Sequence, residues 1–331
     1  MRAVVITAPG GPEVLRIEQR PLPTPAPGEI LIRVHGSAMN RADVLQRQGR
    51  YPPPAGAPAD IPGMELAGVV AARGSDAPRW RLGDRVFGLV AGGAHADYAV
   101  AHESTVCAIP DVLDWDGASA VPEAFITASD ALDQARAATG EAVLVHAVAS
   151  GVGLAAVQLV RARGGLALGT SRSAAKMARA RELGMSDGFD AASGLEALPQ
   201  WVRDHTGGRG ANVALDLVGG AYLRPTLDAL APGGRVMLIG TVAGAEATLP
   251  LGTILRKRLT IRGTVLRSRT LEERAHDARA FAERVVPLLA AGTVKPVIDR
   301  VFNLEEIAAA HRVVESNRTE GKVVLRMTAE H

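Results

Sequence analysis

The stretch Ala142-Val-Leu-Val-His-Ala-Val-Ala-Ser-Gly-Val-Gly-Leu-Ala-Ala156 decides the fold of this chain. Its first five residues form a run typical of a buried strand, and Gly151, Gly153 and Ala156 hold the three small positions of a G-x-G-x-x-[GA] turn. Small residues there permit the tight strand-to-helix turn, approach of the backbone to a pyrophosphate, and close packing of the helix on the strand. The turn predicts a dinucleotide site in which the first N–H groups of the helix, including that of Val152, face the phosphates.

The sequence after this turn alternates between strand-like and helix-like segments. A parallel sheet with right-handed crossover helices produces this alternation, so we expect a doubly wound α/β domain, the Rossmann fold, over residues 121–292. The expected strands are 142–146, 166–170, 213–218, 235–240 and 259–263, and the expected helices are 151–163, 174–183, 222–230 and 271–291.

Residues 1–120 show a different pattern, in which short β-prone runs are separated by proline and glycine. The pattern predicts an irregular, mostly β domain, and the proline-rich segment 51–58 predicts a stiff surface loop. The expected strands are 3–6, 29–34, 66–72, 84–89 and 96–100. Beyond the α/β domain, we expect a helix at 304–316 and a strand at 322–326, and we expect residues 293–331 to complete the first domain.

The residues after the second strand of the α/β domain indicate which dinucleotide binds. NAD-selective folds usually place Asp or Glu there for the ribose hydroxyls. This chain has Thr170-Ser-Arg-Ser173 followed by Lys176, so Arg172 and Lys176 can neutralise a 2′-phosphate while Ser171 and Ser173 donate to its oxygens. The pattern predicts NADPH as the cofactor. The alternative is that Arg172 and Lys176 form only the solvated face of a helix.

A later strand ends at Leu238-Ile-Gly-Thr241, at the edge of the sheet where ligands collect in this architecture. We therefore expect Gly240 and Thr241 near the nicotinamide. Asp216 ends a neighbouring strand and has two interpretations. It is a catalytic acid or, more commonly for a carboxylate just before Gly219 and Gly220, a cap of the turn.

The composition limits the function classes. With 47% hydrophobic and 22% charged residues the chain is typical of a globular protein, and its 37 basic and 35 acidic residues are scattered, which argues against a nucleic-acid partner. We expect no membrane partner, because no stretch reaches the roughly 20 apolar residues of a span, and no export signal. The single cysteine, Cys107, suits a reducing compartment, so we expect a cytoplasmic protein.

The chain resembles, from end to end, the zeta-crystallin-like quinone oxidoreductases, the zinc-independent branch of the medium-chain dehydrogenase/reductase superfamily. The order and spacing of several short motifs carry the resemblance. They are Gly10-Gly-Pro-Glu-Val-Leu15, Pro27-Gly-Glu-Ile-Leu31, Asn40-Arg-Ala-Asp43, Gln48-Gly-Arg-Tyr51, Pro62-Gly-Met-Glu65, Gly83-Asp-Arg-Val86, Gly151-Val-Gly153 and Gly321-Lys-Val-Val-Leu325. The run Arg47–Pro54 and Leu266-Arg-Ser-Arg269 look especially like the tumour-suppressor-induced quinone oxidoreductase subgroup.

The resemblance implies a GroES-like catalytic domain, formed by residues 1–120 and 293–331, next to the Rossmann domain, with the active site in the cleft. It implies that the nicotinamide lies near Asn40 and Tyr51, with Thr127 and Ser150 adjacent. It further implies that Lys176 holds the 2′-phosphate. The region of Asn317 and Lys322 is expected to close over the cofactor.

Two further implications concern the adenine and the oligomer. Many relatives carry a tyrosine on the adenine side after the third strand, whereas this chain has Phe189, so the adenine contacts at this position stay open. Relatives pair edge strands across a two-fold axis, and the β-prone segment 258–263 lies near the end of the α/β half. A homodimer is therefore expected.

Residues 63–65 predict that no catalytic metal is present. The zinc alcohol dehydrogenases of the same superfamily use a catalytic cysteine, a Gly-His-Glu motif and usually four clustered structural cysteines. In Gly63-Met64-Glu65 a methionine replaces the imidazole ligand, and Cys107 stands alone. Without a Lewis acid, acceptors that take hydride readily are favoured, so a quinone or enone is the expected small-molecule substrate.

Tyr51 and Asn40 are the candidate catalytic residues. Tyr51 would form a ring wall of the pocket and donate a hydrogen bond, and Asn40 would orient polar groups; alternatively, Tyr51 anchors its loop and Asn40 forms a turn. Arg267 and Arg269 either meet substrate or cofactor or lie on a solvated loop. Two other functions stay open: an enoyl-thioester reductase of the same superfamily, and a non-catalytic NADPH-binding protein.

Overall fold

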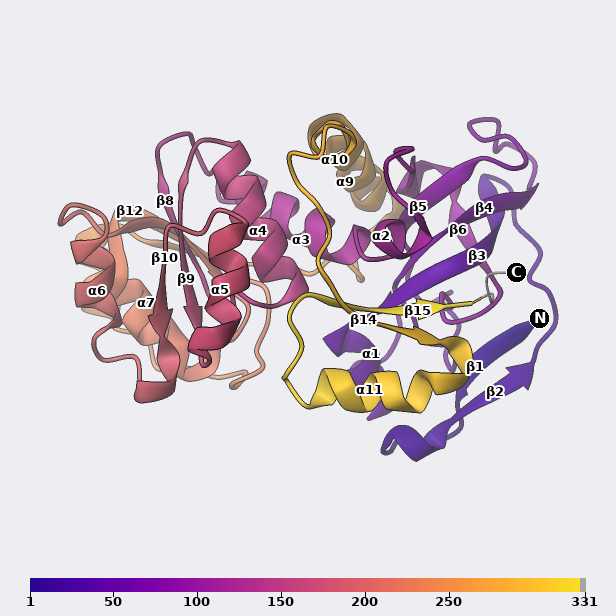
Figure 1. Cartoon of the computed structure of the whole chain (residues 1–331), viewed down its shortest axis with the longest axis horizontal. Coiled ribbons are helices and arrows are strands. Elements are labelled where there is room, and N and C mark those ends of the chain that lie inside the picture. The colour runs from indigo at the N-terminus through magenta and orange to yellow at the C-terminus, as the bar shows by residue number, and fades with distance from the viewer. Residues whose placement is uncertain (328–331) are drawn as a thin grey trace. The chain divides into compact units, whose positions relative to one another are not determined.

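A computed structural model of the chain describes residues 1–327, so the last four residues of the expected segment 293–331 lie outside the described residues. The chain forms two compact units. One combines Met1–Ile126 with the C-terminal part of the chain from Leu266, and the other is Thr127–Val265 (Figure 1).

The unit Thr127–Val265 is built on a parallel sheet. Its strands are β8 (Ala142–Val145), β9 (Leu166–Ser171), β10 (Asp187–Asp190), β11 (Ala211–Asp216), β12 (Leu230–Leu238) and β13 (Thr260–Gly263). They lie in the order β10-β9-β8-β11-β12-β13, and neighbours run parallel. The chain steps outward from β8 first in one direction and then in the other, which confirms the predicted doubly wound fold class.

Helices cover this sheet on its two faces. They are α4 (Gly151–Ala162), α5 (Ala174–Glu182), α6 (Leu198–Asp204), α7 (Leu223–Ala229) and α8 (Leu251–Lys257). Figure 1 shows α4 and α5 on one side of the strands and α6 and α7 on the other. Every residue of β8 is buried, which explains why this strand is a continuous apolar run and does not alternate with polar residues.

The other unit contains a mostly antiparallel sheet in the order β14-β15-β3-β4-β5-β7, in which β6 also pairs with β3, and a separate β1-β2 pair. The strands are β1 (Arg2–Ile6), β2 (Leu15–Gln19), β3 (Glu29–Met39), β4 (Glu65–Arg73), β5 (Arg85–Leu89), β6 (Tyr98–His102), β7 (Val106–Ala108), β14 (Ile298–Asn303) and β15 (Lys322–Arg326). The remaining α-helices are α1 (Arg41–Arg47), α2 (Trp115–Ser119), α3 (Pro122–Gln134), α9 (Leu271–Arg284), α10 (Val286–Ala290) and α11 (Ile307–Glu315). Single-turn 3₁₀ helices span Pro12–Val14, Glu103–Thr105, Ala191–Ser193, Gly220–Tyr222 and Leu304–Glu306.

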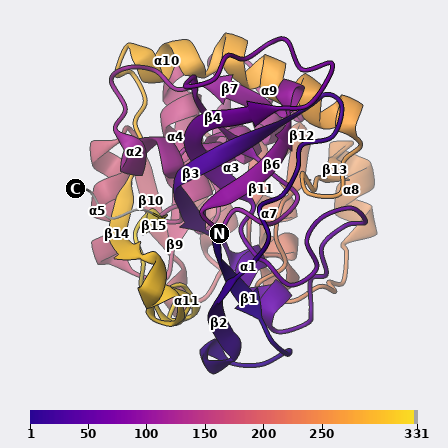
Figure 2. The ribbon, with the colours of Figure 1, turned by 90° about the vertical axis from the view of Figure 1, so that its right-hand side faces the viewer.

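The C-terminal segment is part of the first unit's sheet. Strand β15 pairs antiparallel with β3, so that Val323 lies opposite Met39, and β14 adds parallel to β15. Figures 1 and 2 show these yellow strands beside the indigo N-terminal part of the chain. The core is shared in the same way, because Val323 and Leu325 pack in one cluster with Ile30 and Ile32.

The expected single helix over 271–291 is wrong. The structure divides it into α9, which ends at Arg284, and α10, which begins at Val286. Val285 between them has φ −110°, and Pro287 stands in the first turn of α10, where it has no N–H to continue the hydrogen bonds of α9. Helix α9 packs against β7 (Figure 2).

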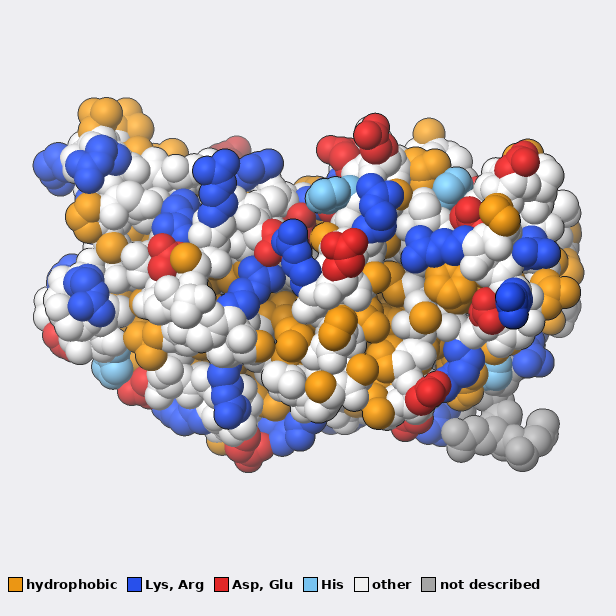
Figure 3. Space-filling view, turned by 90° about the horizontal axis from the view of Figure 1, so that it is seen from above, with side chains coloured by type: hydrophobic (Ala, Val, Ile, Leu, Met, Phe, Trp, Pro, Cys, Tyr) orange, Lys and Arg blue, Asp and Glu red, His pale blue; other side chains and the backbone are white. Residues whose placement is uncertain are grey.

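On the face drawn in Figure 3, basic side chains are scattered, with acidic ones among them. No helix among residues 1–327 is long and apolar enough to cross a membrane.

Candidate active site

The turn between β8 and α4 is shaped as the glycine pattern requires. Ser150 is the N-cap of α4, where its Oγ accepts a hydrogen bond from the Gly153 N–H at 3.1 Å. A Cβ on Gly153 would lie 2.6 Å from the Val148 carbonyl oxygen, so no larger residue fits there. Ala147 has φ 48°, a left-handed conformation that closes the turn.

This turn suits a phosphate-bearing ligand. Helix α4 begins at Gly151, so the amides of Gly151 and Val152 are first-turn N–H groups, and the positive end of the helix dipole lies beside them. The first turn of α4 contains no acidic residue that would repel an anion. These residues therefore fit the pyrophosphate of a dinucleotide.

The predicted 2′-phosphate residues begin with the last residue of β9, the strand next to β8, and continue into α5. Ser171 is buried and its Oγ accepts a hydrogen bond from the Ser173 N–H at 3.2 Å, while Arg172 is exposed and Lys176 is half-buried on α5. Arg172 lies close enough to Tyr222 to oppose the rise in the pKa of that phenol that burial causes. The segment brings two cations and two hydroxyls together and carries no carboxylate.

The loop after β12 lies beside the turn after β11. The Gly240 N–H donates to the Asp216 carbonyl oxygen at 3.2 Å, and a Cβ on Gly240 would lie 2.6 Å from the Leu217 carbonyl oxygen. Thr241 follows and is exposed. The Asp216 carboxylate accepts hydrogen bonds from the Val218 and Gly219 N–H groups, both at 2.8 Å, and so caps its turn.

A buried histidine, which the sequence analysis did not assign, supports this edge of the sheet. The imidazole of His146 follows β8 and lies 2.9 Å from the Thr170 hydroxyl and 2.7 Å from the Thr226 hydroxyl. Burial lowers the pKa of His146, although nearby Asp216 opposes the shift. A neutral imidazole therefore ties β8, β9 and α7 together beneath the glycine turn.

In the other unit, Asn40 belongs to a buried charge network. Lys322 Nζ donates to Glu65 Oε1 and to Asn40 Oδ1, both at 2.6 Å, and to the Met39 carbonyl oxygen at 3.2 Å. Asn40 Nδ2 donates to the same Glu65 oxygen at 2.7 Å. Because Glu65 is fully buried, Lys322 serves as its counter-ion and holds the Asn40 amide in one orientation.

Asn40 also begins a helix. It is the N-cap of α1, where the Asp43 side chain accepts a hydrogen bond from the Asn40 N–H at 2.8 Å. Asn40 therefore forms the turn at the start of α1, and its side-chain amide also belongs to the network with Glu65 and Lys322.

Tyr51 lies against an arginine. The guanidinium carbon of Arg267 is 5.3 Å from the centre of the half-buried Tyr51 ring. Arg267 Nε donates to the Ala91 carbonyl oxygen at 2.8 Å and Nη2 donates to Gln46 Oε1 at 2.7 Å. Since Arg267 is only 7% exposed, a solvated loop is the wrong interpretation for this residue. Burial raises the pKa of Tyr51, which keeps the phenol protonated, and Arg267 opposes the rise.

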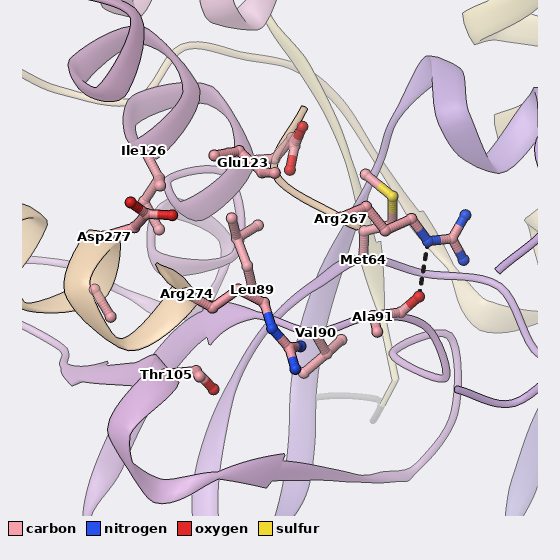
Figure 4. A pocket seen from close by; sticks show the side chains of 12 residues that line it. Met64, Leu89, Val90, Ala91, Thr105, Glu123, Ile126, Arg267, Arg274 and Asp277 are labelled. Carbon is pink, nitrogen blue, oxygen red and sulfur yellow. Dashed lines mark hydrogen bonds between the residues drawn. The ribbon is translucent and has the colours of Figure 1, made fainter. Parts of the chain in front are cut away.

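A cavity in this unit has Arg267 in its wall (Figure 4). It holds roughly 450 Å³, counting the part open to solvent. Most of its wall is apolar, and its polar members are Thr105, Glu123, Arg267, Arg274 and Asp277. The apolar members are Met64, Leu89, Val90, Ala91, Ile126, Leu266 and Ala278.

The remaining predicted residues are Asn317, Thr127 and Phe189. Asn317 has φ 56°, and its side-chain oxygen accepts a hydrogen bond from Arg41 Nη2. Thr127 is buried on α3. Phe189 lies on β10 edge-to-face with Trp201, with 5.6 Å between the ring centres, so this ring packs inside its own unit.

Two family models match the chain. One described as an alcohol dehydrogenase GroES-like domain matches residues 26–111, and one described as a zinc-binding dehydrogenase matches residues 151–284. The chain is 33% identical to a quinone oxidoreductase of Lama guanicoe over 330 residues, which cover 98% of this chain and 97% of the relative. The chain belongs to the zeta-crystallin-like quinone oxidoreductase family. It is therefore an oxidoreductase of the medium-chain dehydrogenase/reductase superfamily, and the predicted family is confirmed.

Solved structures of similar fold carry descriptions with different cofactors. A structure described as an NAD-dependent alcohol dehydrogenase is 31% identical, covers 99% of this chain and 100% of its own, and has a TM-score of 0.87. A mycobacterial protein described as complexed with NADPH is 27% identical, with coverage of 99% and 100% and a TM-score of 0.89. The choice between the two nicotinamide cofactors in this quinone oxidoreductase family member therefore depends on its own residues.

The side chains of Met64 and Glu65, in the Gly63-Met64-Glu65 segment, have other contacts. Glu65 is paired with Lys322, and Met64 is one wall of the cavity. Cys107 is buried on β7, where its thiol donates to the Ala278 carbonyl oxygen at 3.3 Å. Within residues 1–327, no group of three or more His, Cys, Asp or Glu side chains is placed to hold a metal ion.

The polar wall of the cavity was not predictable from the sequence. Glu123 and Arg274 each stand on an amphipathic helix, where a charged residue is most often solvated, so no signal in the sequence set them apart. For Arg267 there was a signal, because Leu266-Arg-Ser-Arg269 was already part of the family resemblance.

Proposed function

We propose that this family member is an NADPH-dependent, zinc-independent reductase that transfers hydride to quinones or similar conjugated carbonyl compounds. The observation that carries the proposal is the segment after β9, where Arg172 and Lys176 stand with Ser171 and Ser173 and no carboxylate is present. The residues proposed to hold the cofactor are Thr127, Ser150, Gly151, Val152, Gly153, Ser171, Arg172, Ser173, Lys176, Gly240, Thr241, Asn317 and Lys322.

Cofactor preference is tested by kinetics with both nicotinamides. The catalytic efficiency, kcat/KM, should be higher with NADPH than with NADH. Arg172→Ala should raise KM for NADPH about tenfold, because a charge-assisted hydrogen bond contributes 1.5 kcal/mol or more, and should leave KM for NADH unchanged. Arg179→Ala, which removes a half-buried cation from the following helix α5, is the control. A preference for NADH in the unmodified protein would overturn the NADPH assignment.

The cofactor, when bound, supplies a hydride, and the chain's residues do the rest. Tyr51 is proposed as a ring wall of the acceptor site and a hydrogen-bond donor, and Asn40, fixed by Glu65 and Lys322, as the group that orients the reactants. The apolar part of the cavity wall suits a small, uncharged acceptor.

The side chains at the position of the zinc ligands argue for a reaction without zinc. Met64 and Asn40 offer a thioether and an amide, which are weak zinc ligands, and the lone thiol of Cys107 is turned to a backbone carbonyl. Reductase activity should survive dialysis against a chelator without loss. A loss that added zinc restores would defeat this part of the proposal.

We also propose an oligomeric state and a location for the protein. Strand β13 is an edge of its sheet and its residues Thr260, Arg262 and Gly263 are exposed, so it can pair with the same strand of a second copy. We expect a homodimer by light scattering of the purified protein, and a monomer would contradict this. A cytoplasmic location remains the expectation from the single cysteine.

A further inference from the structure

One tyrosine of the unit Thr127–Val265 lies at the same edge of the sheet as the glycine turn. Tyr222 is the last residue of the 3₁₀ helix that follows β11. Its ring packs edge-to-face on His146, with 5.1 Å between the ring centres, and His146 directly follows β8. Because Tyr222 is only half-buried, part of its side chain remains accessible to a ligand.

The position of Tyr222 is fixed before a ligand binds. Gly219, just before the 3₁₀ helix, forms a β-bridge with Gly244. The Thr226 hydroxyl donates to the Tyr222 carbonyl oxygen at 2.6 Å. Since the one proton of that hydroxyl is used there, its oxygen accepts a hydrogen bond from His146 Nε2 at 2.7 Å. His146 therefore supports both the ring and the backbone of Tyr222.

Tyr222 also lies beside the residues proposed for the 2′-phosphate. His146, which touches the Tyr222 ring, has its Nδ1 2.9 Å from the Thr170 hydroxyl, and Ser171 and Arg172 come next in the chain. The charge of Arg172 also reaches the Tyr222 phenol, where it opposes the rise in pKa that burial causes. The ring of Tyr222 is thus a neighbour of the end of β9.

The chemistry of the cofactor indicates which group would meet this ring. In NADPH the 2′-phosphate is bonded to C2′ of the adenosine ribose, and the adenine is bonded to the adjacent carbon, C1′. If Arg172 binds the phosphate, the adenine lies beside it. An aromatic ring suits a flat purine, because every base has a face that can stack. The unit's other large aromatic rings, Phe189 and Trp201, pack on each other.

We propose that Tyr222 is a binding residue for the adenosine end of the cofactor, and that its ring forms one wall of the adenine site. The proposal rests on the proposed function, which puts the 2′-phosphate at Arg172. It adds a residue that serves both nicotinamide cofactors, because both carry adenine. Arg172 then distinguishes NADPH from NADH, whereas Tyr222 supplies affinity for either.

Fluorine NMR of the cofactor-free protein tests the contact without turnover. The chain has three tyrosines, so protein labelled with 3-fluorotyrosine gives three resonances, which Tyr51→Phe, Tyr98→Phe and Tyr222→Phe assign. Saturation with 2′,5′-ADP, the fragment that carries the adenine and the 2′-phosphate, should shift the Tyr222 resonance by ring current and leave that of Tyr98 in place. An unmoved Tyr222 resonance, with saturation established by calorimetry, would overturn the proposal.

Substitution measures the size of the effect. Tyr222→Leu should weaken the binding of 2′,5′-ADP and of 5′-AMP about tenfold in calorimetry, in the range that one base–aromatic contact contributes. Tyr222→Phe should retain the affinity, and because both variants lack the hydroxyl, their difference measures the ring. Tyr98→Leu, the same kind of change on β6 of the other unit, is the matched control. Equal affinity in folded Tyr222→Leu and the unmodified chain would reject Tyr222; if Tyr222→Leu does not fold, the fluorine shift decides.

The cofactor assignment and the role of Tyr222 fail separately in these measurements. If the unmodified chain binds 5′-AMP more tightly than 2′,5′-ADP, the NADPH assignment fails, and the Tyr222 resonance is then followed with 5′-AMP. If the unmodified chain prefers 2′,5′-ADP and Tyr222→Leu binds it equally well, Tyr222 is rejected while the proposed function stands.

Discussion

At the scale of single residues, the side chains with defined chemistry are fixed by partners that the sequence places far away. Asn40 is held by Glu65 and Lys322, and Arg267 by Gln46 and Ala91. Each functional group thus has one orientation before any ligand arrives. Such pre-organisation is what electrostatic catalysis requires, because the dipoles do not have to move as charge develops.

Replacement of Tyr51 separates its two proposed roles. If the hydroxyl donates a hydrogen bond or a proton to the acceptor, Tyr51→Phe should lower kcat with small quinones about 100-fold, in the range of general acid catalysis, and leave the melting temperature unchanged. Tyr98→Phe, which removes a hydroxyl from β6 of the same unit, is the control. If Tyr51 only anchors its loop, the turnover will be unaffected and the stability will fall.

Some residues of the candidate site were predictable from the sequence and others were not. The glycine turn and the cations after β9 were predictable, because their chemistry depends on local spacing along a strand and a helix. The burial of Arg267 was not predictable, since it depends on Gln46 and Ala91, which lie in a part of the chain that folds against it from a great sequence distance. An isolated arginine after a β-prone run has the same local pattern whether it is solvated or buried.

At the scale of elements, the turn from β8 into α4 depends on the absence of a side chain at one position. Gly153→Ala would place a Cβ 2.6 Å from the Val148 carbonyl oxygen and 2.7 Å from that of Ala147. The helix would have to move away from the strand, at a cost of about 1–3 kcal/mol in the free energy of unfolding. Affinity for NADPH, measured by fluorescence titration, should fall at least tenfold.

Gly263→Ala is the control for that substitution, because a Cβ on Gly263 meets nothing within 4 Å and the residue lies in the same unit. Equal NADPH affinity in Gly153→Ala and the unmodified chain would show that the turn does not approach the cofactor.

Elements with one dominant hydrophobic period were predicted well. An element with few apolar residues, and a break within a continuous apolar period, were not. The buried strand 142–146 and the helix starting at 151 agree with β8 and α4. Strand β10, Asp187-Gly-Phe-Asp190, was missed because only one of its residues is apolar and its pairing with β9 supplies the order. The break between α9 and α10 was missed because the apolar period continues across Pro287.

At the scale of the whole molecule, buried histidines make folding sensitive to acid. Burial lowers the pKa of His311 to about 2, with additional effects of His95 and Arg47, whereas an unfolded histidine titrates near 6.5. Above pH 6.5 the group is neutral in both states and contributes nothing to the pH dependence. Between about pH 6.5 and 2 the unfolded chain binds one more proton at this site, so the free energy of unfolding falls as the pH falls.

The expected slope from His311 is about 1.4 kcal/mol per pH unit. Urea unfolding at pH 6, 5 and 4 should show that His311→Leu flattens the dependence by that amount, whereas His276→Leu, at an exposed position, leaves it unchanged. An identical slope in His311→Leu and the unmodified chain would show that His311 is protonated in the folded state.

The pairing of β15 with β3 has a consequence for how the chain is made on the ribosome. Lys322 and Met39 are neighbours in space and 283 residues apart in sequence. Until β15 has been translated, residues 36–39 of β3 lack their partner strand, and Glu65 lacks the counter-ion with which it is buried. The unit Thr127–Val265 is complete as soon as Val265 has been translated. During synthesis of the residues that follow Val265, the nascent protein can therefore have this unit formed while the other unit still lacks its last strands.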